Sequence, residues 1–76
     1  MPHVIVKLQV GRSESQKARI AEAVTKAVVA EAKCGEESVS VSIEDIAAGD
    51  WTEKVYKPDI VGDWDRLYKK PGYTPI

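Results

Sequence analysis

Aliphatic and polar residues alternate along two short stretches of the chain. In the first stretch, residues 3–10, every second position is aliphatic: Val4, Val6, Leu8 and Val10. In the second, residues 38–45, the aliphatic positions are Val39, Val41 and Ile43, and serine fills most of the positions between them. A period of two with many β-branched residues is typical of a strand that buries one face. We therefore predict two β-strands.

Between the two stretches the hydrophobic period changes to that of a helix. Ser13 is a good N-cap, and Gln16 completes a capping box, with Glu14 in the first turn. Apolar residues then recur at helical spacing up to about Lys33: Ile20, Val24, Ala27 and Val28. Gly35 is placed to end the helix in a left-handed conformation. We predict a helix from Ser13 to about Lys33.

A strand, a long helix and a second strand form a right-handed βαβ unit in which the two strands are parallel. The serine-rich face of the second strand is informative, because a parallel strand covered on both faces is apolar along its whole length. That face is therefore solvated, paired with another subunit or lining a site. Ile5 makes the corresponding face of the first strand partly apolar, and we expect this face to meet a partner subunit.

The rest of the chain is less regular. Residues 47–51 predict a tight turn or a short 3₁₀ segment. Pro58 can occupy the first position of a helix, and an apolar stripe at helical spacing follows it: Ile60, Val61, Trp64, Leu67 and Tyr68. Gly62 weakens such a helix by about 1 kcal/mol relative to alanine, and Pro71 with Gly72 ends it. We predict a short C-terminal helix over residues 58–70.

Chain length and cysteine content restrict how the protein is stabilised. Its 76 residues form a single small domain, residues 1–76, and a domain of this size buries only about 60–65% of the surface of its unfolded chain. Cys34 is the only cysteine and His3 the only histidine, so neither a disulfide nor a metal cluster can help. Oligomerisation is the remaining means, and we expect a homo-oligomer.

Charge and hydropathy argue against several classes of partner. The net charge is −1 with both signs interspersed, whereas a nucleic-acid-binding domain carries a basic face. No apolar run approaches the roughly 20 residues of a membrane span, and the N-terminus lacks a signal-peptide pattern. A single thiol fits a reducing compartment. We expect a cytoplasmic protein that binds neither nucleic acid nor a membrane and that carries no metal.

Pro2 is the most informative single residue. Initiator methionine is normally removed before a small residue, so the mature chain would begin with the free secondary amine of Pro2. An α-amino group has a pKa of about 8, and desolvation lowers that pKa further. A proline amine in an apolar pocket can therefore be neutral near pH 7 and act as a general base. If Met1 is retained, the Pro2 nitrogen is an amide and cannot act as a base.

The residues after Pro2 carry a family resemblance. The first strand and the element Gly-Arg-Ser-x-x-Gln-Lys at residues 11–17 resemble the opening of the 4-oxalocrotonate tautomerase family. Residues 38–43 and Trp51 also fall at the family's spacing. The Lys-Lys-Pro-Gly-Tyr tail at residues 69–73 resembles the extended-tail bacterial subgroup that acts on phenylenolpyruvate. The resemblance implies an α/β protein with the βαβ tautomerase fold, whose copies pair into a four-stranded sheet.

The same resemblance implies a site. Pro2 matches the family's base, and Arg12 matches the arginine that binds the substrate. The family's second arginine, which a neighbouring subunit supplies, is replaced by Ser40, and its pocket phenylalanine is replaced by Trp51. One guanidinium fork binds one carboxylate, and an indole adds apolar surface. We expect a cofactor-free keto–enol tautomerase of a small enol or keto acid with one carboxylate, such as phenylenolpyruvate.

Two other functions are compatible with the residues. A hydratase or dehalogenase of an unsaturated acid would need Pro2 as an acid and a second group to activate water, for which Glu44 and Asp45 are the candidates. A non-catalytic oligomeric scaffold of the same fold is the other alternative, because the second arginine is missing.

Oligomer size and the full set of pocket residues are less constrained. We expect a dimer rather than the hexamer of shorter family members, because the added C-terminal helix would cover the surface through which dimers pack together. Lys7, Tyr56 and Tyr73 are candidates to reach the pocket, but the sequence does not decide which of them does.

Overall fold

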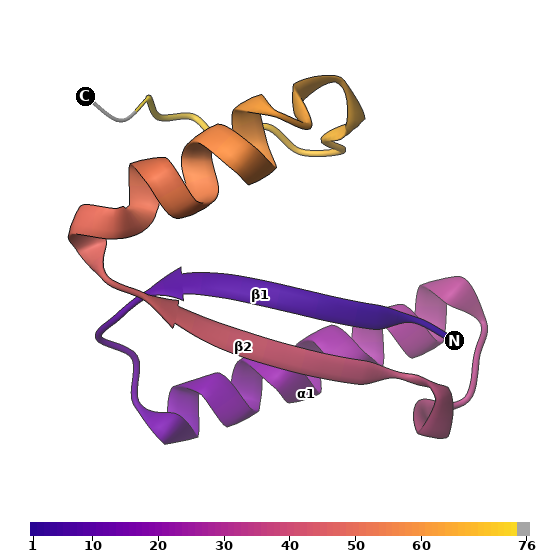
Figure 1. The fold of residues 1–76 in the computed structure, drawn as a ribbon. Helices are drawn as coiled ribbons and strands as arrows, with labels where there is room; N and C mark the ends of the chain where they lie inside the picture. The colour runs from indigo at the N-terminus through magenta and orange to yellow at the C-terminus, as the bar shows by residue number, and fades with distance from the viewer. Residues whose placement is uncertain (75–76) are drawn as a thin grey trace.

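The computed structural model of the protein describes residues 1–74, so the last two residues of the expected 1–76 domain lie outside the described part. The elements follow in the order β1 (His3–Gln9), α1 (Glu14–Ala32), η1 (Glu36–Ser38), β2 (Ser40–Ile46), η2 (Ala48–Asp50), η3 (Thr52–Val61) and η4 (Trp64–Arg66). Figure 1 shows α1 running along the pair of strands, with η3 lying beyond β1 on the opposite side.

The two strands form a parallel pair, which confirms the predicted βαβ arrangement. The register runs from His3 opposite Ser40 to Gln9 opposite Ile46. The hydrogen bond from the Val10 N–H to the Ile46 carbonyl, 3.0 Å, continues the pairing past the end of β1. Because successive side chains in a strand point to opposite faces, the paired residues divide into two sets, one on each face of the sheet.

Two ion pairs identify the helix that lies nearest to each face. Lys17 of α1 binds Asp45 of β2 at 2.8 Å, so the face that carries Asp45 is turned toward α1. Lys7 of β1 binds Asp59 of η3 at 2.6 Å. Lys7 pairs with Glu44, the neighbour of Asp45, and therefore belongs to the other face. We call this second face, which carries His3, Ile5, Lys7, Ser40, Ser42 and Glu44, the open face.

Helix α1 begins as the sequence predicts. The Ser13 hydroxyl accepts from the Gln16 N–H at 3.1 Å, and the Gln16 side chain accepts from the Ser13 N–H at 2.9 Å, which completes the capping box. Of the apolar residues at helical spacing, Ile20, Val24 and Val28 are half-buried, whereas Ala27 is exposed.

The end of α1 and the start of β2 differ from the prediction. The left-handed residue is Lys33, with φ 58°, and not Gly35, which has φ −80° and precedes η1. The helix ends at Ala32, Lys33 turns the chain, and residues 36–38 then form the 3₁₀ turn η1. That turn also occupies Ser38, so β2 begins at Ser40 rather than at residue 38.

The C-terminal helix also lies elsewhere than predicted. The 3₁₀ turn expected within residues 47–51 is present as η2, but the helix that follows is η3, Thr52–Val61, with Pro58 in its interior. Its hydrogen bonds span five residues, as from the Gly62 N–H to the Lys57 carbonyl at 2.9 Å. These are π-helical hydrogen bonds. They differ from the α-helical bonds between residues four apart, which an interior proline disrupts. The predicted helix over residues 58–70, with its single stripe, is therefore wrong.

A single chain has almost no core. Within residues 1–74 only Val55 is buried, with 4% of its surface exposed, while Ile5 on the open face is 53% exposed. Each apolar Å² left in water forgoes about 25 cal/mol of stabilisation. The exposed Ile5 leaves this face available to a partner subunit, and its contact with one stays a prediction.

Replacing Gly62 with alanine should lower the free energy of unfolding by about 1–3 kcal/mol, the usual range for an overpacked site. A β-carbon at residue 62 would fall on the Pro58 carbonyl oxygen, which is backbone and cannot turn away. Gly49→Ala is the matched control, because its β-carbon would meet no heavy atom within 4 Å. Thermal unfolding checks this, and equal melting of the two variants would contradict it.

Candidate active site

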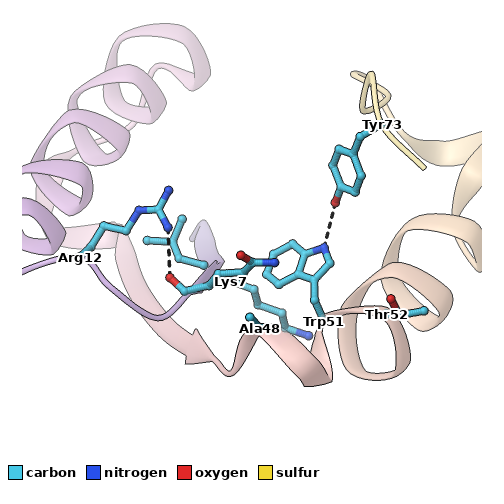
Figure 2. Close-up of a pocket in the computed structure, with 8 residues that line it drawn as sticks. Lys7, Arg12, Ala48, Trp51, Thr52 and Tyr73 are labelled. Atoms are coloured by element: carbon cyan, nitrogen blue, oxygen red, sulfur yellow. Dashed lines mark hydrogen bonds between the residues drawn. The ribbon is translucent and has the colours of Figure 1, made fainter. Parts of the chain in front are cut away.

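A cavity of about 480 Å³ lies where β1 and β2 end and η3 begins. Its lining combines two cations, two aromatic rings, two aliphatic side chains and two neutral polar ones: Lys7, Leu8, Gln9, Arg12, Ala48, Trp51, Thr52 and Tyr73. Figure 2 shows Arg12 on one side of this pocket, with Trp51 and Tyr73 on the other. Arg12 and Trp51, two of the predicted site residues, therefore share one pocket.

Local backbone geometry places Arg12 at the end of β1. Gly11 has φ 127°, a conformation that side-chain-bearing residues rarely adopt, and it turns the chain out of the strand. The Arg12 guanidinium donates to the Gln9 carbonyl at 3.1 Å, and Ser13 then caps α1. The Arg12 side chain is exposed in the single chain. It can therefore receive an anion without first breaking a buried ion pair.

The aromatic wall of the pocket comes from two distant segments. The Trp51 Nε1–H donates to the Tyr73 hydroxyl at 2.8 Å, as Figure 2 shows. The Tyr73 ring packs against Tyr56 of η3, with ring centroids 5.8 Å apart. Tyr73 and Trp51 thus line the pocket directly, whereas Tyr56 contacts Tyr73 without lining the pocket.

Lys7 brings a second cation to the pocket, in contact with an acidic side chain. Its Nζ lies 2.6 Å from an Asp59 carboxylate oxygen. That hydrogen bond raises the pKa of Lys7 above its ordinary value, although desolvation opposes the shift. The Glu44 carboxylate, on the strand position paired with Lys7, also raises this pKa by its charge. Lys7 is therefore fully charged at neutral pH.

The other two predicted site residues lie at the opposite end of the strands. The Ser40 N–H donates to the Pro2 carbonyl at 3.2 Å, and the Ser40 hydroxyl lies 2.7 Å from His3 Nδ1. The seven residues of β1 separate this end from Arg12, a length of about 20 Å at 3.3 Å per residue. Within one chain, Pro2 and Ser40 therefore do not share the pocket of Arg12 and Trp51.

The two carboxylates considered for water activation lie on different faces. Asp45 is held by Lys17 on the face that α1 covers, so it is not available to the pocket. Glu44 is exposed on the open face. Only one of the two candidates is therefore accessible from the pocket side of the sheet.

Of the three undecided candidates, Lys7 and Tyr73 line the pocket, whereas Tyr56 does not. Thr52 was not anticipated, because it opens η3, a helix that the sequence placed elsewhere. The Asp59 partner of Lys7 gives no sequence signal.

Residues 1–74 contain neither a metal-binding cluster nor a membrane-spanning helix. No group of three or more His, Cys, Asp or Glu side chains is placed to hold a metal ion in this part of the chain. None of the helices described here has the length and apolar character needed to cross a membrane.

Comparison with known sequences gives consistent matches over most of the chain. A family model described as "Tautomerase enzyme" matches residues 2–55. A probable tautomerase of Xylella fastidiosa is 40% identical over 76 residues, which cover 100% of this chain and 93% of that protein. Tautomerase PptA of Cronobacter sakazakii is 32% identical, over 96% of this chain and 97% of its own length.

Comparison with solved structures points the same way. A 4-oxalocrotonate tautomerase isozyme of Methylibium petroleiphilum superposes with a TM-score of 0.64 at 34% identity, over 66% of this chain and 81% of that one. YwhB, a homologue of 4-oxalocrotonate tautomerase, gives a TM-score of 0.59 at 39% identity, over 60% of this chain and 75% of its own.

Proposed function

Because the chain belongs to the tautomerase family and is thus a tautomerase-type enzyme, we propose that it is a keto–enol tautomerase with Pro2 as its general base. The base becomes available when Met1 is removed and the Pro2 nitrogen is a free secondary amine. Arg12 binds the substrate carboxylate, Trp51 forms the apolar wall, and Ser40 stands beside the base. The proposed reaction moves one proton and needs no cofactor.

One observation carries this proposal: Arg12 and Trp51 share a pocket of about 480 Å³ that is rich in cationic and aromatic groups. In this pocket the Arg12 guanidinium can bind a carboxylate, and the Trp51 indole can pack against an aromatic group of the substrate. The pocket lacks a base, and the proposed base lies at the far end of β1. A second copy of the chain can supply it.

Strand β1 offers the means of pairing two copies. The sheet of residues 1–74 has the order β1-β2, so one edge of β1 has no strand of that part of the chain beside it, and exposed edges are sites of strand addition. An antiparallel pairing of two β1 strands about a two-fold axis through Val6 sets Pro2 of one copy opposite Val10 of the other. Arg12 follows Val10 by two residues. Each pocket would then receive Pro2 and Ser40 from the second copy.

The chemistry in such a composite site is a proton shuttle. The neutral Pro2 amine takes the hydroxyl proton of the enol, and the electron pair of that O–H bond forms the carbonyl. The electrons of the C=C bond then take the proton back from the prolinium nitrogen at the neighbouring carbon. Arg12 stabilises negative charge on the substrate as the hydroxyl proton leaves. Trp51 and Tyr73 exclude water from the amine, which keeps Pro2 neutral.

The pocket's composition supports a substrate with one carboxylate. Ser40 can donate a single hydrogen bond but brings no charge where other family members carry a second arginine. Phenylenolpyruvate offers one carboxylate for Arg12 and a phenyl ring for Trp51. The segment from η3 onward occupies surface beside β1 (Figure 1), which favours a dimer over a hexamer.

Ketonisation of phenylenolpyruvate is the direct test. We expect mature protein, shown by intact mass to begin at Pro2, to have a kcat/KM for phenylenolpyruvate at least about tenfold above that for 2-hydroxymuconate, because each unpaired terminal carboxylate costs about 1.4 kcal/mol or more. Loss of the enol absorbance measures both rates. A protein that turned over neither enol would support the scaffold alternative instead.

A further inference from the structure

Lys7 and Asp59 form a contact that joins the pocket to η3. Lys7 lines the cavity beside Trp51, and its Nζ lies 2.6 Å from the Asp59 carboxylate. The side chains are 31% and 41% exposed, respectively, so the pair is partly shielded from solvent. Screening weakens such a pair less than a fully exposed one.

Counting formal charges shows what this contact does to the pocket. Lys7 would by itself be a second cation beside Arg12, and two cations suit a dicarboxylate. Asp59 cancels the charge of Lys7, and Glu44 stands at the strand position paired with Lys7. One positive and two negative groups leave this end of the pocket with a net negative charge. A second substrate carboxylate would therefore meet repulsion instead of a counterion.

We propose that Asp59 is a specificity-determining residue that acts through Lys7 and makes the pocket favour acids with one carboxylate over acids with two. The inference rests on the proposed function, because it concerns the charge of the acid that the same site accepts. Asp59 itself does not line the cavity. It is a positioning residue, which withholds the Lys7 ammonium from the ligand.

Ligand binding tests the inference without requiring turnover. Calorimetry would measure dissociation constants for cinnamate, which has one carboxylate, and for cis,cis-muconate, which has two. Asp59→Asn should improve the binding of muconate relative to cinnamate about three- to tenfold, the effect of removing one nearby and partly shielded charge. Asp59→Glu keeps the charge and should keep the wild-type preference.

Asp63→Asn is the matched control. The Asp63 carboxylate is also 41% exposed and pairs with Arg66, away from Lys7. Its removal changes the net charge by the same amount and should alter the muconate-to-cinnamate ratio by less than about 1.5-fold. Lys7→Gln combined with Asp59→Asn should abolish the gain, because no cation is then released.

Equal changes of the muconate-to-cinnamate binding ratio for Asp59→Asn and Asp63→Asn would overturn the role of Asp59. So would an improved ratio that persists without Lys7, or a wild-type protein that binds neither acid. If Asp59→Asn does not fold, Lys7→Met is the substitute: it leaves Asp59 and Glu44 without a counter-charge, so the preference for cinnamate should become stronger, and a lost preference would count against the inference. A binding preference that behaves as expected, in a protein that ketonises no enol, would contradict only the proposed function.

Discussion

Pro2→Ala should lower kcat for phenylenolpyruvate about 10²-fold or more, within the range that a positioned general base contributes. Alanine after Met1 still permits removal of the methionine and leaves a primary amine, so a trace of activity should persist. The rigid secondary amine of proline is lost, and with it the fixed direction of its lone pair. Stopped-flow measurement of ketonisation, with intact mass confirming a start at residue 2, gives the result.

Protein of unchanged sequence that retains Met1 is the sharpest control for this prediction. The Pro2 nitrogen is then an amide without basic character, while the residues of the pocket stay the same. We expect activity below that of the alanine variant. Full activity of either species would mean that the base lies elsewhere, and Glu44 would be the first carboxylate to examine because it is exposed on the open face.

Mixing two inactive variants should restore activity if each site is shared between copies. Pro2→Ala and Arg12→Ala should each lose most of their rate. Random reassortment makes about half of the dimers mixed, and one of the two sites in each mixed dimer has both residues intact. Co-refolded protein should therefore recover about one quarter of the wild-type rate. The expected effect is large because the ketonisation rate rises from near zero in either variant alone.

The control for reassortment is a mixture in which no site can be intact. Pro2→Ala mixed with the double variant Pro2→Ala/Arg12→Ala lacks the base in every site and should stay inactive under the same refolding conditions. If the Pro2→Ala and Arg12→Ala mixture also stays inactive, while native mass spectrometry shows mixed dimers, the two residues do not meet across the proposed β1 pairing.

Local sequence signals predicted the βαβ unit well because each was consistent with the next. The period of β1, the capping box at Ser13 and the alternation of β2 all gave elements that are present, and the assignment to the tautomerase family is confirmed. The C-terminal helix was predicted in the wrong place because Pro58 is typical of a first helical position, whereas here it lies inside a helix with π-helical hydrogen bonds. No local sequence pattern predicts π-helical hydrogen bonding.

The candidate site was only partly predictable for a topological reason. The resemblance named Pro2, Arg12, Ser40 and Trp51 as one site, and the structure brings only Arg12 and Trp51 together. The length of β1 makes the separation of the others unavoidable within a chain. Tyr73 was an undecided candidate and Asp59 was not anticipated, because the contacts of both depend on how η3 and the tail lie relative to β1.

The hydrogen bond from Trp51 to the Tyr73 hydroxyl makes the pocket depend on an intact C-terminal tail. The βαβ unit ends at Ile46, so its strand pairing does not involve residue 73. A chain cut before Tyr73 would keep β1, α1 and β2 but lose the partner of the indole and one wall of the pocket. Because chain termini are preferred sites of proteolysis, cleavage of the tail would impair the site before it impairs the fold.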